Sequence, residues 1–163
     1  MKTARIFLPI LLLTGCCKSI PSTDIIKPEI TIEVSDAINS KTYSSKDTSK
    51  FQIPFETNEG IVSINIKCHD KGGIRQLDYN MNSGILERYH TEKFLVDESK
   101  DPLHKTLTYH GSDKCIEQII NMPIMIKPMN ENGVVEFSVT AEDFGGNSKN
   151  INKEETPTIK IHF

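Results

Sequence analysis

The sequence contains no tryptophan, and only 7% of its 163 residues are aromatic. This composition disfavours a sugar-stacking platform, although four tyrosines and seven phenylalanines are present. An excess of basic residues is also missing, since 19 Lys and Arg stand against 22 Asp and Glu and give a formal net charge of −3. The chain therefore lacks the electrostatic footprint of a protein that binds nucleic acid or anionic lipid headgroups.

Long hydrophobic runs are absent as well, because no apolar stretch approaches the 18 residues of a membrane-spanning helix. One short run, IFLPILLL at residues 6–13, follows a basic start that contains Lys2 and Arg5. Its length is typical of the hydrophobic region of a signal peptide and is too short to cross a bilayer of about 30 Å. Residues 1–15 are therefore expected to be a signal peptide that is removed.

The apolar run ends in Leu13-Thr14-Gly15-Cys16, which resembles the lipobox of bacterial lipoproteins. The resemblance implies that a diacylglycerol is attached to the Cys16 thiol and that the leader is cut just before it. Two or three acyl chains such as palmitate hold a protein durably on a membrane, because each buried CH₂ contributes about 0.8 kcal/mol. The expected location is the bacterial cell envelope, with an exported domain in the periplasm or at the cell surface. An ordinary cleaved signal peptide followed by chance cysteines is the alternative.

Cysteine is scarce, with four residues in the whole chain. Cys17 lies next to the expected lipid site, whereas Cys68 and Cys115 lie in the body of the protein. An exported location permits a disulfide between Cys68 and Cys115. The alternative is that Cys68, which is surrounded by apolar residues, is a buried free thiol.

Three parts of the chain differ in composition. After the leader, residues 16–28 are polar, contain two prolines and show no hydrophobic period, as expected for a tether. Residues 29–163 then have the size of one domain.

Alternation of apolar and polar residues dominates that domain. The clearest runs are 30–34, 62–68, 135–142 and 159–163. A period of two in many short runs, with one polar face, predicts antiparallel β-sheets packed on a single core. Weaker runs occur at 74–81, 107–109 and 124–126.

Other segments carry weaker signals. Pro54 makes the segment FQIPF an edge or irregular strand. The segment SDKCIEQIIN at 112–121 is expected to form one or two helical turns capped by Ser112 or Asp113. Residues 36–50 are expected to be a polar loop.

Two similar corners, IKCHDKGGIRQL and VTAEDFGGNSK, each run from a strand through an aspartate and a glycine pair. They resemble the B–C and F–G corners of bacterial immunoglobulin-like domains. The resemblance implies an all-β antiparallel sandwich of seven to nine strands, in which Asp70 and Asp143 lie at the same end.

The strand order between residues 82 and 133 is left open. Strands C and F of such a sandwich run in opposite directions, so an even number of strands must separate them. Three segments are recognisable, at 85–96, 103–109 and 122–127. Either one of them is not a strand, or the segment 84–98 breaks into two.

Motifs for catalysis are missing. Asp143-Phe144-Gly145 has the letters of a kinase magnesium motif, but the Gly-rich loop, the V-A-I-K lysine and the H-R-D loop are absent. This stretch is therefore predicted to be a structural turn, with Gly145 or Gly146 at positive φ. The five histidines lack the spacing of metal ligands and are expected to face solvent. No cofactor, no catalytic residue and no established metal site is expected.

Calcium is considered only for the two corner aspartates. Asp70 and Asp143 could hold Ca²⁺ through carboxylate oxygens if the corners meet. Alternatively, each aspartate caps its own turn by accepting hydrogen bonds from backbone N–H groups.

The function expected from these features is non-catalytic binding or interaction at the bacterial envelope. The membrane is reached through the lipid on Cys16, the partner is a protein or a glycan, and nucleic acid is not a partner. A structural role in an envelope assembly, and an accessory domain or hydrolase with an unrecognised site, are the alternatives.

Overall fold

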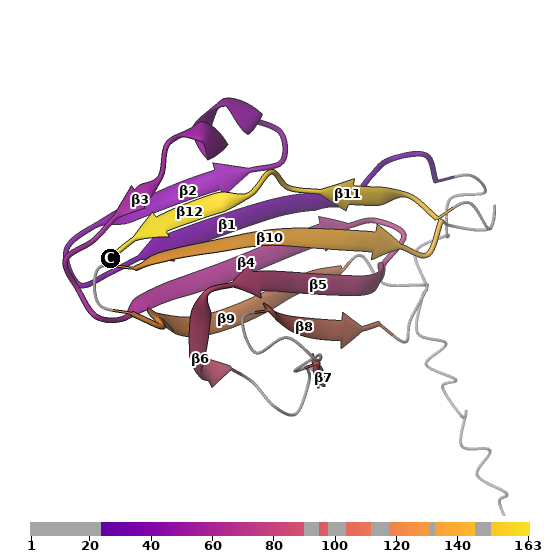
Figure 1. Ribbon diagram of the computed structural model, residues 1–163. Helices are drawn as coiled ribbons and strands as arrows, with labels where there is room; N and C mark the ends of the chain where they lie inside the picture. Colours follow the sequence, from indigo (N-terminus) through magenta and orange to yellow (C-terminus); the bar gives the residue numbers. More distant parts are fainter. Residues whose placement is uncertain (1–23, 90–94, 98–103, 112–117, 131–132, 146–150) are drawn as a thin grey trace, which may run out of the picture.

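The computed structural model describes residues 24–89, 95–97, 104–111, 118–130, 133–145 and 151–163. These residues form two packed β-sheets (Figure 1). The strands are β1 (Glu29–Ser35), β2 (Ser40–Ser44), β3 (Phe55–Glu56), β4 (Val62–Asp70), β5 (Ile74–Asn82), β6 (Gly84–Tyr89), β7 (Leu95–Asp97), β8 (His104–His110), β9 (Gln118–Pro128), β10 (Val134–Asp143), β11 (Lys153–Glu155) and β12 (Ile159–His162). A short 3₁₀ helix, η1, spans Thr48–Gln52. Within the described ranges there is no helix with the length and apolar character needed to cross a membrane.

The two sheets have different strand orders. Sheet A is β2-β1-β4-β9-β6, and sheet B is β3-β12-β10-β5-β8-β7, with β11 also paired to β10. Neighbouring strands are antiparallel, except that β3 runs parallel to β12. This is the immunoglobulin-like sandwich that the alternating pattern and the two corners predicted.

The core lies between the sheets and is built from every second side chain of the long strands. In β4, buried and more exposed residues alternate over the whole strand, as they do in β1. Tyr79 of β5 packs against Phe137 of β10 with ring centroids 5.2 Å apart. Fully buried aliphatic side chains from both sheets surround this pair, including Ile32, Ile64 and Leu77.

The described residues form twelve strands, more than the seven to nine expected, because β3, β7 and β11, which are only two or three residues long, add to nine longer strands. Four strands, β6 to β9, separate the antiparallel neighbours β5 and β10. The segment 84–98 breaks into two strands, β6 and β7, which is one of the two arrangements that the direction rule left open.

The expected helical turns at 112–121 are wrong in their second half. Residues 118–121 belong to β9 and pair with the end of β4, where Cys68 lies opposite Ile120. Antiparallel pairing along β4 satisfies the backbone there, so the apolar run continues a strand. Residues 112–117 lie outside the described residues.

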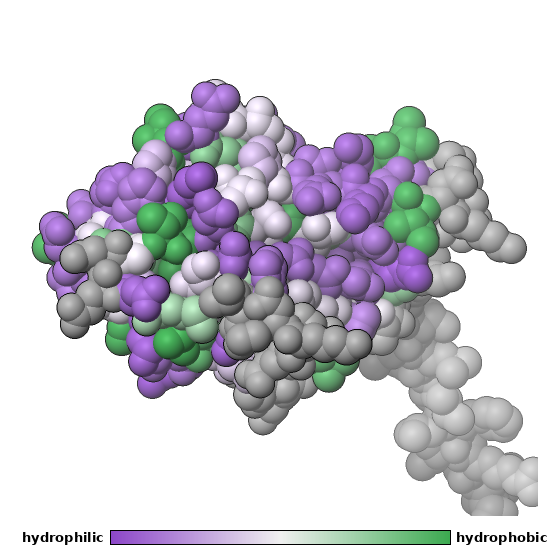
Figure 2. Space-filling model, viewed as in Figure 1, coloured by the Kyte–Doolittle hydropathy of each residue, from purple (hydrophilic) through white to green (hydrophobic). Residues whose placement is uncertain are grey.

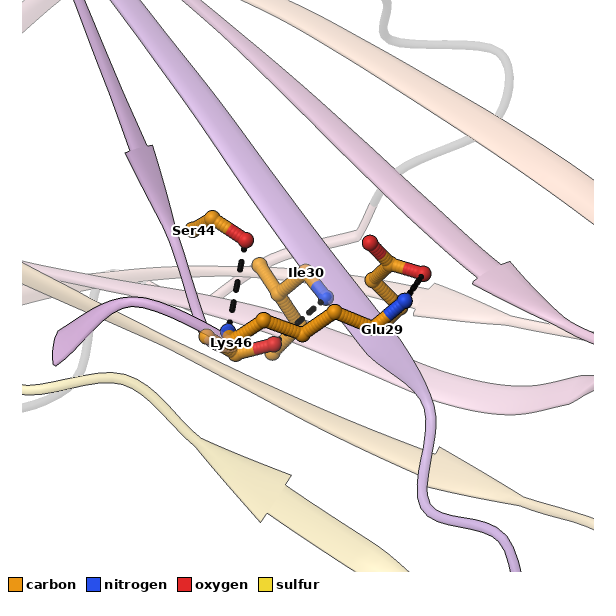
Figure 3. A network of polar contacts seen from close by, with 5 residues as sticks. Glu29, Ile30, Ser44 and Lys46 are labelled. Carbon is orange, nitrogen blue, oxygen red and sulfur yellow. Dashed lines mark hydrogen bonds and ion pairs between the residues drawn. The ribbon is translucent and has the colours of Figure 1, made fainter.

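The expected loop at 36–50 is also wrong in part. Only its start turns back on itself, and residues 40–44 form β2, paired with β1. Beyond β2 the chain returns to the beginning of β1, where the Ile30 N–H donates to Ser45 Oγ at 3.1 Å and Lys46 pairs with Glu29 (Figure 3). Pairing with β1 therefore brings Ser45 to the end of the sandwich where β1 starts.

Pro54 has the effect expected of it. The segment that contains it gives only the two-residue β3, which is the outermost strand of sheet B. The described chain ends at the other end of the sandwich from the ends of β4 and β10 (Figure 1). There, the Phe163 N–H donates to the Gly133 carbonyl at 3.2 Å.

Within the described ranges Cys68 has no disulfide partner, and its side chain is completely buried between the sheets. Burial, together with the nearby Asp70 carboxylate, raises the pKa of this thiol to about 12. Cys115 lies outside the described residues, so its pairing with Cys68 stays a prediction.

Two buried tyrosines allow the cost of an unpartnered hydroxyl to be measured. The Tyr79 hydroxyl has no hydrogen-bond partner within the described ranges, whereas the Tyr43 hydroxyl donates to the Ile53 carbonyl at 3.2 Å. We expect Tyr79→Phe to leave the free energy of unfolding unchanged or to raise it by roughly 1 kcal/mol, because it removes an unsatisfied polar atom. The matched change Tyr43→Phe should lower it by about 1 kcal/mol. Denaturant unfolding of both variants measures the difference, and a larger loss for Tyr79→Phe than for Tyr43→Phe would contradict it.

Candidate functional site

One end of the sandwich gathers acidic side chains from distant parts of the chain. Strand β4 ends at Asp70 and β10 ends at Asp143, and both strands finish at the end where β1 begins. Antiparallel pairing brings Asp143 level with Ile74, just after the β4–β5 turn. The expectation that Asp70 and Asp143 lie at the same end is therefore confirmed.

Each of these two aspartates caps its own turn. Asp70 Oδ1 accepts the Gly72 N–H at 2.7 Å, and Asp143 Oδ1 accepts the Gly145 N–H at 2.8 Å. Gly73 and Gly145 adopt positive φ values of 88° and 66° in the turns that follow. The stretch around Asp143-Phe144-Gly145 is thus a structural turn, as predicted.

Asn152 ties the Asp143 turn to a third segment. Its backbone N–H donates to Asp143 Oδ1 at 2.8 Å, and its side-chain amide donates to Asp143 Oδ2 at 2.7 Å. The same amide nitrogen lies 2.9 Å from the backbone carbonyl of Asp24, to which it also donates. Asn152 therefore joins the end of β10 to the segment that enters the domain.

Asp24 is the member of this site that sequence reasoning missed. It lies in the segment expected to be a tether, yet only 4% of the residue is exposed, and Pro28 is also buried. Residues 24–28 are thus held by the sandwich, with Lys27 forming an ion pair with Glu154 at 3.1 Å. No period or motif marks Asp24, so the only available signal was its position shortly before the first alternating strand.

The three aspartates form a compact buried cluster. Each offers one carboxylate oxygen, and these oxygens all lie within 4.8 Å of one another. Only 3% of Asp70 and 0% of Asp143 are exposed. Gly72 lies against the cluster, because a Cβ atom at this position would come within 2.6 Å of Asp24 Oδ2.

The cluster changes the acidity of Asp70. Burial raises the pKa of the Asp70 carboxyl to about 6, against the opposing effect of the hydrogen bond from Gly72. The negative charges of Asp24 and Asp143 raise this pKa further, and His69 lowers it. Like charges in a poorly hydrated site disfavour full ionisation.

A second feature is a groove on the outer face of sheet A. It has a volume of about 540 Å³ and is lined by side chains from β1, β4, β6 and β9. Tyr89, Pro123 and Met125 supply apolar surface, while Arg88 and Glu33 supply opposite charges. A register shift in β6 between Leu86 and Arg88 lies beside this groove.

The remaining residues considered in the sequence are dispersed. His104 and His110 are exposed, as expected, and His162 forms a contact of 3.1 Å with Glu56. Among the described parts of the chain, the cluster of Asp24, Asp70 and Asp143 is the only group of three or more His, Cys, Asp or Glu side chains close enough to share a metal ion. Cys16, His90 and Cys115 lie outside the described residues.

Because of the buried Asp70 carboxyl, the free energy of unfolding is expected to depend on pH between about 4 and 6. In the folded protein the Asp70 carboxyl stays protonated up to about pH 6, whereas in the unfolded chain it loses its proton near pH 4. Without added metal, the free energy of unfolding should therefore fall as pH rises from about 4 to about 6, by an amount on the order of 2 kcal/mol. Denaturant titrations in chelator should show this fall for the wild type and a much flatter profile for Asp70→Asn. Equal slopes for the two proteins would contradict the assignment.

Comparison with known proteins supports the fold only. No protein-family model matches the sequence, and no curated protein matches it. Among solved structures, the full-length major pilin SpaD from Corynebacterium diphtheriae is similar over 82% of this chain, with a TM-score of 0.51 and 10% identity. The aligned region is 35% of the pilin, so this chain spans about a third of that protein's length. The collagen-binding subdomain of the Enterococcus faecalis surface protein ACE aligns with 66% of this chain and 92% of its own length, with a TM-score of 0.44 and 9% identity.

Proposed function

We propose that the protein is a lipid-anchored component of the bacterial cell envelope whose sandwich binds a protein partner without catalysing a reaction. The groove on the outer face of sheet A carries the binding part of this proposal. The lipobox at Leu13-Thr14-Gly15-Cys16 carries the anchoring part. Both parts are open to separate tests.

The lining of the groove favours a protein over a glycan. Tyrosine, methionine and arginine are enriched at protein interfaces, and Tyr89, Met125 and Arg88 lie together here. Glu33 provides an opposite charge in the same groove, which would orient a partner that carries both signs. A glycan platform would be expected to offer more aromatic surface than the single tyrosine of this groove.

The face seen in Figure 2 offers less for such a partner. The face seen in Figure 2 is largely hydrophilic, and its hydrophobic residues form small separate patches. Scattered apolar residues of this kind are normal on a soluble domain and need no partner. The groove on sheet A combines a concave shape with apolar and charged side chains, and this combination makes it the proposed binding surface.

The position of the groove suits a domain held from its acidic end. Asp24 lies eight positions after Cys16, and a chain of this length can span at most about 30 Å. An anchor on Cys16 would therefore keep the end with Asp24, Asp70 and Asp143 close to the bilayer. The groove residues Ser35 and Ser63 lie near the other end of their strands, so they would face a partner that arrives from solution.

Site-specific photocrosslinking tests the binding surface. A photoreactive residue at exposed Ser63, in the groove, should give one discrete adduct in native membranes. The same residue at exposed Lys160, on the outer face of sheet B, should give none. Met125→Glu should reduce the Ser63 adduct at least about fivefold, because it places a charge among the apolar groove residues.

Each outcome of the crosslinking experiment has a definite meaning. Equal adducts from Ser63 and Lys160, or an adduct insensitive to Met125→Glu, would reject the groove as the binding surface. An adduct with the mass of two copies of the chain would support the structural-assembly alternative instead. Thr106→Glu, on the outer face of sheet B, is the matched control and should leave the Ser63 adduct unchanged.

Labelling on lipid vesicles tests the anchor and the orientation together. Single cysteine reporters are placed at Lys71, beside the acidic end, and at Asn39, at the opposite end, in a background without Cys17, Cys68 and Cys115. Both positions are exposed, so a membrane-impermeant reagent should label them equally in detergent. On vesicles, the Lys71 reporter should react more slowly because the bilayer shields it.

The Cys16→Ala protein is the control for this labelling. Without the acyl chains it should leave the membrane fraction, and its two reporters should react at equal rates. A Cys16→Ala protein that stays with membranes after an alkaline wash would reject lipid attachment at this residue. Faster labelling at Lys71 than at Asn39 on vesicles would reject only the orientation.

A further inference from the structure

We propose that Asp24, Asp70 and Asp143 form a binding site for one calcium ion, which fastens the N-terminal segment to the end of the sandwich. This site is distinct from the groove on sheet A and does not depend on the proposed binding of a protein partner. The backbone holds these carboxylates in place, since each of the three accepts the N–H of the residue two positions ahead in the chain.

The spacing of the carboxylates fits a calcium ion. Calcium lies about 2.3–2.6 Å from its oxygen ligands, so two oxygens on the same ion are separated by at most about 5 Å. One oxygen from each aspartate satisfies this limit, because the three lie within 4.8 Å of one another. The cluster therefore supplies three convergent ligands, and calcium can complete its shell with further oxygens such as water.

An independent observation is the state of Asp24. Its Oδ1 accepts the Ile26 N–H at 3.0 Å, but its buried Oδ2 has no hydrogen-bond partner within the described ranges. Only 4% of Asp24 is exposed, and Oδ2 lies on the side of the carboxylate that faces Gly72 and the Asp70 carboxylate. A buried carboxylate oxygen without a donor is costly, and a cation bound among the three oxygens would satisfy it.

Nearby positive side chains do not neutralise the cluster. Lys27 pairs with Glu154 and Arg75 pairs with Glu142, and no described ion pair joins a lysine or an arginine to Asp24, Asp70 or Asp143. The two residues beside Asp70 in the chain are His69, which lowers the pKa of Asp70, and Lys71, whose side chain is exposed. The negative charge of the three buried carboxylates is therefore not balanced by a described lysine or arginine, and a divalent cation would balance it.

The chemistry of the ligands selects the ion. All three ligands are carboxylate oxygens, which hard cations prefer, and the cluster contains neither a histidine nor a cysteine of the kind that zinc and copper favour. Magnesium binds less readily at such a site, because it requires nearly octahedral geometry and gives up its water reluctantly. Calcium tolerates irregular arrangements of ligands.

Calcium would join three segments that are far apart in the sequence. Asp24 belongs to the entry segment, Asp70 to the end of β4, and Asp143 to the end of β10. A shared ion would fix the direction in which the chain leaves toward Cys16. The attachment of the domain would then stiffen when calcium is abundant.

Calorimetric titration and thermal unfolding of the full-length protein in detergent test the site. After removal of metal with a chelator, CaCl₂ should bind with a stoichiometry of one ion per chain. At a free concentration about 100-fold above Kd it should raise Tm by about 5–10 °C. MgCl₂ at the same concentration should produce a clearly smaller rise. No calcium-dependent change, or an equal effect of magnesium, would overturn the proposal.

Neutral variants separate loss of the site from loss of the fold. Asp24→Asn keeps the oxygen that accepts the Ile26 N–H but removes one ligand charge, so calcium affinity should fall at least about 100-fold. In chelator, this variant should melt at the same temperature as the wild type or higher, because repulsion with Asp70 is relieved. The control Asp36→Asn changes an exposed turn cap at the opposite end and should bind calcium normally. Unchanged calcium affinity in Asp24→Asn would overturn the assignment.

Hydrogen exchange provides a local measurement. Calcium should slow the exchange of the Ile26 and Gly72 amides at least about tenfold, because both donate to carboxylates of the cluster. The Ile38 amide, which donates to Asp36 at 2.8 Å, should exchange at the same rate with and without calcium. Gly72→Ala retains all three carboxylates but pushes against Asp24 Oδ2, so it should weaken calcium binding at least about tenfold. Slowing at Ile38 equal to that at Ile26 would show general stabilisation and would overturn the local site.

Discussion

The structure depends on one constraint, that every second side chain of the long strands is buried between the two sheets. The constraint is strict because a shift of one residue in register would turn the whole apolar set toward water. Strand β4 meets it over nine residues while pairing with β1 on one side and β9 on the other. The outward side chains of the same strands are thereby left free, and most of the groove lining comes from these outward positions.

The same constraint disfavours charged residues on the buried face of a strand and favours them at the strand ends. An aspartate in the middle of a buried face would have no donors, whereas at a corner the turn that follows supplies N–H groups. From the described residues Asp143 accepts three hydrogen bonds, two from backbone amides and one from the side-chain amide of Asn152. Asp70 and Asp24 accept one described backbone N–H each, so the three carboxylates are unequally stabilised. The corner thus combines a rigid backbone with charge that its own donors do not fully balance.

The sequence predicted the parts of the fold that have a local physical signal. Alternation located β1, β4, β10 and β12, and the direction rule for strands C and F allowed the break between β6 and β7 as one of two alternatives. The helical turns expected through 118–121 were wrong, because a short apolar run such as Ile119-Ile120 fits a strand as well as a helix. The loop at 36–50 was wrong in part, because the polar residues of β2 find their backbone partners in β1.

The sequence could predict only those parts of the candidate site whose position follows from the order and direction of the strands. The similar corners placed Asp70 and Asp143 at one end, since the ends of antiparallel strands are fixed once the fold is known. Asp24 could not be found this way, because its burial depends on contacts with Asn152 and the β4–β5 turn, which lie far away in the sequence. The groove was not predicted either, since it arises from outward side chains of four strands and from the bulge in β6.

The short outer strands of sheet B have a consequence for molecules crowded on a surface. Its two edges are β3 and β7, which are only two and three residues long, and β3 follows directly after Pro54. A long free edge would be a template on which a neighbouring chain could add its own strand and begin to aggregate. These edges offer few unpaired backbone groups, and the register shift in β6 interrupts one edge of sheet A. Copies of the domain held side by side at high density would therefore meet short or interrupted edges at β3, β7 and β6, while their sheet faces stay accessible.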